Sequence, residues 1–384
     1  MSTNVRERQI FEEISKLSRQ YHCEDREEVR DMVLGFNKDV SEEAKRIHRE
    51  ALIIDTCTFN LEQDNWALQA SGVTGLNCTV PGTKDTATEA MRCFIDYYQA
   101  VRYHSDKFII AYEADDLVKA KEQGKYGVIL GAQSCDFVFH NDLFASVEVF
   151  ANLGLRIMPV AYNHSTFAGD GCYAISNGGL TKEGRTLIDA MERFGITVDL
   201  SHVGERTSMD SLEYCSKVPV FSHSNPRTLF DHPRNISDEL AKKCAEKGGV
   251  IGVCAYPPIL WDGEHFPTID TFMDCMVYFA DLVGVDHVGI GIDSNAQPGA
   301  YQHRDSAYFA NLTREVGGTN SIDYRSYLAG RGYLGCCTEG IGGLANFPNI
   351  TEHMLRRGFK EDEIKKILGG NWLRVFRQTW PHTK

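Results

Sequence analysis

The stretch ITVDLSHVGERTSMDSLEYCSKVPVFSHSN, residues 196–225, contains two short apolar runs separated by a more polar segment. The first run, 196–203, and the second, 218–225, are rich in Val and Ile, and each ends in polar residues. Continuous apolar runs of this length are typical of parallel strands that are buried on both faces. The stretch therefore predicts a strand, a helix and a second strand parallel to the first.

The same alternation extends over most of the chain. Six further apolar runs, most of them followed by a helical pattern, bring the total to eight: 51–56, 72–80, 126–133, 156–163, 249–257 and 287–295. Eight strands alternating with helices predict an α/β protein with a closed (β/α)8 barrel, as in TIM barrels. A doubly wound open sheet is the rival, but no GxGxxG motif follows an early strand, and eight strands are the number that closes a barrel.

Segments with other patterns flank this alternation. Residues 1–50 have apolar residues at helical spacing among charges and predict an N-terminal helical extension, with the barrel occupying 51–384. The segment 296–347 follows the eighth run and is rich in Gly, Tyr and polar residues, so we expect a lid, a subunit contact or both. The tail, 349–380, has a helical pattern and is expected to pack on the outside of the barrel.

Composition restricts the class of protein. With 384 residues, of which 42% are hydrophobic, the chain can bury a large core, and its formal charge of -13 with scattered basic residues argues against a nucleic-acid partner. No apolar run reaches the length of a membrane span or a signal sequence, so we expect a cytoplasmic protein with no membrane partner. The 12 cysteines lie mostly within apolar runs, which is typical of reduced core thiols.

Polar residues end the predicted strands, where barrel enzymes place their chemistry. His202 and His223 end two consecutive runs and are expected at neighbouring positions of one mouth, as in metallohydrolases that bind a divalent ion. Asp293, at the end of the eighth run, is suited to act as a general base or to hold a substrate ammonium group. The alternatives are two unrelated histidines satisfied by hydrogen bonds and a carboxylate that caps a turn.

Several motifs occur in the order and spacing of one enzyme family. These are VDLSHV, VFSHSN, HPRNISDE, DHVGIGID and the tail FPNITEHMLRRGFKEDEIKKILGGNWLRVF. In this combination, residues 51–380 resemble the membrane (renal) dipeptidases, a family of amidohydrolase-like metallohydrolases. The resemblance implies a (β/α)8 barrel, usually dimeric, that hydrolyses dipeptides or related small amides at a two-zinc centre. It also implies that His202 and His223 bind one metal, that Arg234 binds the substrate carboxylate, and that Asp293 is the family's conserved acid.

The chain departs from the family pattern at four roles. Cys57 and Phe59 stand where the family has a His-x-Asp pair that holds the other zinc, and Gln133 replaces the bridging glutamate. Tyr162 replaces a histidine that helps to polarise the scissile carbonyl, although His164 lies nearby and could contact the substrate. The two-zinc mechanism therefore does not transfer to this chain without change.

Three functions stay open at this point. The first is a hydrolase of a small carboxylated amide or dipeptide-like substrate, with one Zn²⁺ per chain, although another divalent metal or none stays open. Its expected assembly is a homodimer or a higher homo-oligomer. Its metal candidates are His202, His223, Gln133 and Cys57, its catalytic candidates are Asp293 and Tyr162, and its substrate-binding candidates are Arg234, Tyr162 and His164. The second is another reaction in the same barrel, such as decarboxylation, elimination or deamination, in which the same polar groups serve as acids and bases. The third is a catalytically silent homologue.

Overall fold

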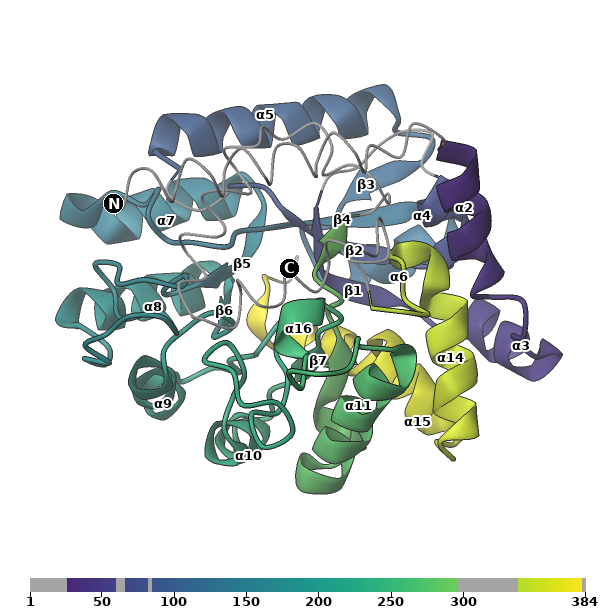
Figure 1. Ribbon diagram of the computed structural model, residues 1–384. Helices are drawn as coiled ribbons and strands as arrows, with labels where there is room; N and C mark the ends of the chain where they lie inside the picture. The colour runs from purple at the N-terminus through teal and green to yellow at the C-terminus, as the bar shows by residue number, and fades with distance from the viewer. Residues whose placement is uncertain (1–25, 60–65, 82–84, 296–337, 382–384) are drawn as a thin grey trace, which may run out of the picture.

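Parallel strands form the centre of the molecule, and helices surround them (Figure 1). The structure is a computed structural model, and it describes residues 26–59, 66–81, 85–295 and 338–381. The strands are β1 Ile54–Phe59, β2 Gly75–Thr79, β3 Phe108–Ile110, β4 Tyr126–Gly131, β5 Leu155–Pro159, β6 Thr197–Asp199, β7 Ile251–Val253, β8 Val288–Ile290 and β9 Ser294–Asn295. They pair in the order β6-β5-β4-β2-β1-β9, with β3 beside β4, while β7 pairs with β8.

Short contacts join these two groups of strands into one barrel. Single parallel bridges at Val220 and Phe221 connect β6 to β7. On the other side, Thr56 Oγ1 donates a hydrogen bond to the carbonyl of Ile290 over 3.0 Å, and β1 pairs with β9. The chain therefore has the α/β barrel that the sequence predicts, with strands in the expected order.

Two strands differ from the prediction in detail. The sixth run, 218–225, contributes only the two bridges, because the N–H groups of Ser222 and His223 donate to the side chains of Asp199 and Ser201 instead of a main-chain ladder. The short strand β3 was not predicted. It spans three residues and pairs only with the first half of β4, so its apolar signal is too brief to separate from the neighbouring helices.

The helices form a ring around the strands (Figure 1). They are α2 Arg26–Gly35, α3 Glu42–Glu50, α4 Trp66–Ser71, α5 Ala87–Tyr103, α6 Asp115–Glu122, α7 Leu143–Asn152, α8 Lys182–Phe194, α9 Glu205–Tyr214, α10 Asp238–Glu246, α11 Ile269–Val283, α14 Phe347–Arg356, α15 Glu361–Lys365 and α16 Asn371–Thr379. Polar side chains fix several starts: Thr86 and Glu89 form a capping box at α5, and Thr181 caps α8. Of the helices described, none combines the length and apolarity that a membrane crossing requires.

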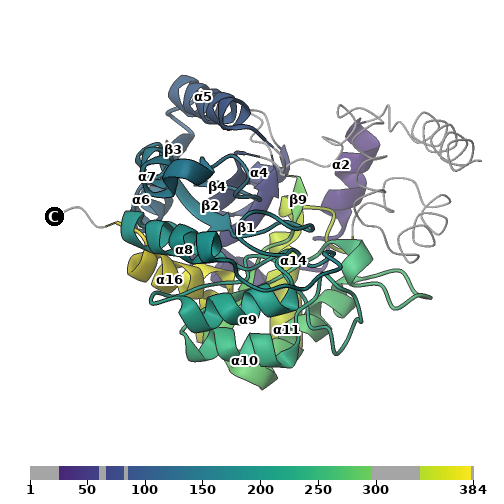
Figure 2. The ribbon, with the colours of Figure 1, turned by 90° about the vertical axis from the view of Figure 1, so that its left-hand side faces the viewer.

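The last helix closes the amino-terminal end of the barrel. Trp372 of α16 is fully buried among apolar residues from the starts of several strands, including Ile54 and Val250. Gly289 makes room for it, because a Cβ at that position would lie 2.4 Å from Trp372 Nε1. The tail is thus helical as predicted, but only its first part, α14 and α15, packs on the outside. Figure 2 shows α16 on one side of the sheet and α2 on the other.

The N-terminal helices pack against the tail. Arg46 of α3 forms a 2.6 Å ion pair with Glu361, Ser41 donates to Glu352 over 2.6 Å, and Ile47 is buried in the main core. Residues 338–347 also join the barrel. The predicted lid or subunit contact, 296–347, lies outside the described residues from 296 to 337, so this prediction and the 1–50/51–384 division remain predictions.

Candidate metal centre

The carboxyl ends of the strands bring most of the predicted site residues to one place. Cys57 lies in β1, and the others follow their strands directly: Gln133 after β4, Tyr162 after β5, His202 after β6, His223 after the two bridges and Asp293 after β8. In a parallel barrel these ends share one face, which is the face opposite α16. The sequence rule that placed polar strand ends together therefore identifies the site.

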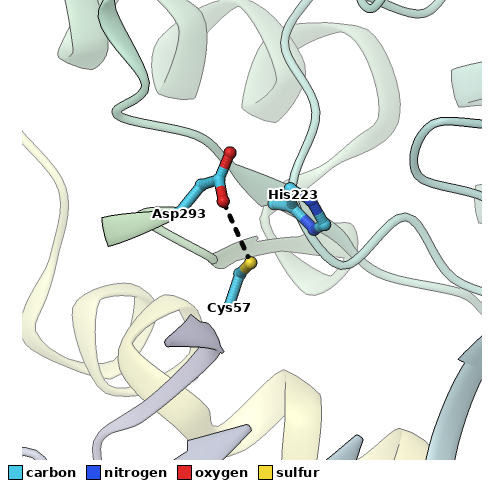
Figure 3. A group of neighbouring side chains, drawn as sticks. All are labelled: Cys57, His223 and Asp293. Atoms are coloured by element: carbon cyan, nitrogen blue, oxygen red, sulfur yellow. Dashed lines mark hydrogen bonds between the residues drawn. The ribbon is translucent and has the colours of Figure 1, made fainter. Parts of the chain in front are cut away.

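Three of these side chains form a compact group (Figure 3). One donor atom each from Cys57, His223 and Asp293 lies within 4.8 Å of the other two. The Cys57 thiol donates to Asp293 Oδ1 over 3.3 Å, and both Cys57 and His223 are 2% exposed, while Asp293 is partly exposed. A thiol, an imidazole and a carboxylate are the donor types of zinc sites.

Gln133 stands behind this group. Its Nε2 donates to Cys57 Sγ over 3.2 Å, and the side chain is buried. The amide nitrogen thus faces the sulfur, where it can stabilise negative charge on Cys57. Gln133 is placed to support the thiol, one step behind the donor atoms of the group.

His202 lies on the other side of His223. The two Nε2 atoms are 2.9 Å apart, and each ring has an oxygen partner at Nδ1, which is Asn163 Oδ1 at 2.8 Å for His202 and Ser222 Oγ at 2.6 Å for His223. Tyr162 stacks on His202 with ring centroids 3.9 Å apart and an interplanar angle of 26°. Stacking on Tyr162 therefore fixes the plane of the His202 ring, and the hydrogen bond at Nδ1 fixes its rotation within that plane.

The backbone is strained at this end of the barrel. Of the four non-glycine residues with positive φ in the described part of the chain, three lie here: Asn163 at 60°, His202 at 69° and Asp293 at 56°. This conformation costs about 1–3 kcal/mol per residue and persists where the surroundings hold it. Here the loop after β5 contributes, because the N–H of Cys172 donates to the carbonyl of His202 over 2.8 Å. Strain of this kind clusters at functional sites.

A buried arginine sets the electrostatics. Arg234 is 5% exposed and donates to Ser224 Oγ at 3.0 Å and to the carbonyl of His223 at 2.7 Å. None of the carboxylates in the described ranges forms an ion pair with it, although its charge acts on nearby Asp293. Burial, with the charge of Arg234 as the second cause, holds the pKa values of His202 and His223 well below the usual range. Both rings are therefore neutral near pH 7, as metal ligands must be.

Burial acts in the opposite direction on the acids. It raises the pKa of Asp293, an effect that Arg234 partly opposes, and it raises the pKa of the Cys57 thiol, to which Asp293 adds. Burial thus disfavours the charged form of both groups.

Two residues near the group were not singled out by the sequence reasoning. Cys254 follows β7, and its Sγ lies 4.0 Å from Asp293 Oδ2, while Ser222 contacts the ring of His223. The same strand-end rule would have found Cys254, but a serine directly before a histidine gives no distinctive signal. His164, in contrast, is exposed on the loop after β5, and its role in substrate binding stays a prediction.

The donor set can accommodate one divalent cation. Zinc bonds of about 2.0–2.3 Å place neighbouring donors roughly 3–4 Å apart, which agrees with the 4.8 Å limit within the group of Cys57, His223 and Asp293. No second group of three potential ligands occurs among the residues that the structure describes. The side chains of this group therefore suit a divalent ion.

Comparison with known proteins agrees with this geometry. The sequence pattern of the membrane dipeptidase family (peptidase family M19) matches residues 60–321 and 328–382. The chain belongs to this family. The resemblance noted from the sequence motifs is thereby confirmed. The altered residues are therefore compared with the metal centre of this family.

Solved structures support the membrane dipeptidase assignment. An amidohydrolase from Pseudomonas aeruginosa is 32% identical, with a TM-score of 0.77 over 88% of this chain and 99% of that one. The probable dipeptidase PvdM from the same organism, 18% identical with a TM-score of 0.72 over 89% of this chain and 98% of that one, has the same fold.

The matches to curated relatives cover a smaller share of those proteins. Dipeptidase tcpJ from Claviceps purpurea is 25% identical over 287 residues, which are 74% of this chain and 58% of that protein. An uncharacterized dipeptidase, C965.12, from Schizosaccharomyces pombe is 30% identical over 226 residues, which are 56% of this chain and 53% of that protein. The chain thus spans a little more than half the length of these relatives.

Proposed function

We propose that this chain is a metal-dependent hydrolase of small carboxylated amides or dipeptide-like substrates that uses one Zn²⁺ per chain. The observation that carries the proposal is the group of Cys57, His223 and Asp293 next to Arg234, a buried cation without an ion-pair partner among the described residues. The group offers metal donors, and the arginine offers a site for an anionic substrate end. Membership of the membrane dipeptidase family supports both roles.

Arg234 is the proposed anchor of the substrate. Its two hydrogen bonds, to Ser224 and to the His223 carbonyl, hold the guanidinium in place without neutralising it. A substrate carboxylate would supply the missing counterion and could bind the planar fork through two oxygens. This contact would orient the amide toward the metal donors, since Arg234 bonds directly to the main chain of one of them.

The metal would be held by His223, Cys57 and one oxygen of Asp293, with His202 adjoining through its Nε2. When bound, a divalent cation supplies the Lewis acidity that amide hydrolysis near neutral pH requires. The second oxygen of Asp293, which accepts from Cys254 Sγ over 4.0 Å, would hold the proton of the attacking water. Tyr162 is the proposed donor to the substrate carbonyl, and His164 would contact the substrate from the rim.

The identity of the metal and the setting of the protein are further parts of the proposal. Sulfur from Cys57 favours zinc over magnesium or manganese. The nine cysteines within the described ranges are free thiols, which supports a reducing compartment such as the cytoplasm. A homodimer is proposed from the family resemblance, with 296–347 as a lid or subunit contact.

The experiment compares matched substrates on the purified protein. Dipeptides with a free C-terminal carboxylate are assayed beside the same dipeptides with an amidated C-terminus, before and after removal of metal with a chelator and after zinc is added back. We expect turnover of the free acids only, with loss on chelation and recovery with zinc. Turnover that resists complete metal removal would contradict the proposal and point to metal-free acid and base chemistry.

A further inference from the structure

We propose that Ser222 and Asp199 are positioning residues that set the hydrogen-bonding state of His223, so that its Nε2 presents a lone pair to the metal. The inference rests on the proposed metal site and goes beyond it, because neither residue is among the proposed ligands and Ser222 reaches the group of Cys57, His223 and Asp293 only through His223 Nδ1. It follows from counting the hydrogens in a chain of contacts that is buried throughout: Asn163, His202, His223, Ser222 and Asp199.

The count begins at Asp199. Its Oδ1 accepts from the N–H groups of Ser201 at 3.0 Å and Ser222 at 2.9 Å, and its Oδ2 accepts from the Ser222 hydroxyl at 2.5 Å. An ionised carboxylate can only accept, so the hydrogen in the short contact with Ser222 comes from the hydroxyl, whose contact with Ser201 Oγ is longer at 3.2 Å. The single hydrogen of the Ser222 hydroxyl is therefore committed to Asp199.

The consequence reaches His223 through the same hydroxyl. Ser222 Oγ lies 2.6 Å from His223 Nδ1, and with its hydrogen already donated it can only accept there. His223 must then carry its ring hydrogen on Nδ1, which leaves a lone pair on Nε2. This is the arrangement in which a ligating histidine donates its second ring nitrogen to an acceptor behind it.

His202 faces this lone pair. Its Nδ1 lies 2.8 Å from the side-chain amide of Asn163, which accepts through Oδ1 or, after a turn of the amide, donates through Nδ2. The Nε2 atoms of the two rings are 2.9 Å apart, which is a hydrogen-bonding distance. With hydrogen on its own Nδ1, His223 accepts from His202 Nε2–H, and the same lone pair is the one that a cation would take.

In the opposite arrangement the Ser222 hydroxyl turns its hydrogen from Asp199 to His223. Ser222 would then donate to His223 Nδ1, and His223 Nε2–H would donate to His202, so that the rings would satisfy each other and His223 could not bind a metal without rearrangement. The two arrangements differ in one observable property, which is the nitrogen of His223 that carries hydrogen.

The test removes the hydroxyl of Ser222. Zinc affinity is measured by competition with a chromophoric chelator for the wild type, Ser222→Ala and the matched control Ser224→Ala, which removes a buried hydroxyl that contacts Arg234 and neither imidazole. Loss of an outer partner of a ligating histidine typically weakens metal binding about 10- to 100-fold. We expect that loss in Ser222→Ala and an affinity near wild type in Ser224→Ala and in Ser222→Thr, which keeps the hydroxyl.

A second readout separates positioning from a general structural effect. Nitrogen NMR of ¹⁵N-histidine-labelled, zinc-loaded protein should show His223 with hydrogen on Nδ1 in the wild type, and a changed Nδ1 signal in Ser222→Ala. If Ser222→Ala does not fold, Asp199→Asn provides the same comparison. Wild-type affinity in a folded Ser222→Ala variant would overturn the inference and leave the proposed function intact. A wild type that binds no zinc would overturn the proposed function itself.

Discussion

The two ends of the barrel differ in the kind of side chain that they bury. At the amino-terminal end, α16 inserts Trp372 among Ile54, Val250 and other apolar residues, and the tryptophan ring is fully buried. At the carboxyl end, buried histidines, a thiol and an arginine without an ion-pair partner among the described residues converge, and three non-glycine residues there have positive φ. One end contains apolar packing, and the other contains buried polar groups that hydrogen-bond to one another.

This difference separates stability from chemistry. Apolar burial stabilises the fold roughly in proportion to area, so the α16 end contributes to the free energy of unfolding. Neutral imidazoles, a buried cation and strained backbone lower that free energy and are retained where a ligand completes them. Variants at the α16 end should therefore change the free energy of unfolding, and variants at the carboxyl end should change zinc binding and kcat/KM.

The largest effect is expected from removal of both histidines at the carboxyl end. His202→Ala combined with His223→Ala should abolish zinc binding and reduce kcat/KM at least about 1,000-fold, since the proposed cation loses two nitrogen donors. Elemental analysis measures the zinc content, and dipeptide assays measure kcat/KM. The metal-free stability should fall much less than for a core variant, because both rings lie outside the apolar packing around Trp372. Retained zinc at one equivalent would place the metal elsewhere.

The opposite end is tested by Trp372→Ala. Truncation of a fully buried aromatic residue costs about 3–5 kcal/mol of unfolding free energy, measured by denaturant titration. Trp372→Phe serves as the milder control, and its zinc affinity should equal that of the wild type. A Trp372→Phe protein that folds but loses zinc would show that the two ends are not separable.

His48, which lies away from the site, provides a further test of this comparison. His48 of α3 is buried between Thr351 Oγ1 at 2.8 Å and the carbonyl of Ser71 at 2.7 Å, and burial lowers its pKa to about 4. The unfolded chain binds the proton near pH 6.5 and the folded chain only near 4. The stability that depends on neutral His48 is therefore complete above pH 6.5 and falls as the pH drops toward 4, by up to about 3 kcal/mol.

The measurement is the free energy of unfolding between pH 7 and pH 4 for the wild type and for His48→Gln. We expect a shallower decrease in the variant, because glutamine does not take up a proton. Identical slopes in the two proteins would mean that His48 does not control acid stability.

The smallest effect is expected from Arg234→Lys. Lysine keeps the charge but loses the planar fork, so the change should lower kcat/KM for carboxylated substrates about 10- to 100-fold while the melting temperature changes little. Amidated substrates, which lack the carboxylate, provide the control and should show no comparable decrease. An unchanged kcat/KM for the free acids would exclude Arg234 as the anchor.

Much of this architecture could be predicted from the sequence. Apolar runs gave seven of the eight barrel positions as strands and located His202, His223 and Asp293 at one mouth, because strand-end residues of a parallel barrel share a face. The role of α16 could not be predicted, since periodicity reveals which face of a helix is apolar but not which surface it covers. The contact of Cys57 with Asp293 joins residues 236 positions apart and depends on the whole intervening chain being folded correctly.

The central claim is that one metal ion binds per chain. Elemental analysis of protein purified without chelators from zinc-supplemented cells measures it directly. We predict about one equivalent of zinc per chain, because Cys57, His223 and Asp293 form one donor group and Gln133 offers no carboxylate to bridge a second ion. Two equivalents per chain would contradict the account, and so would the absence of bound metal.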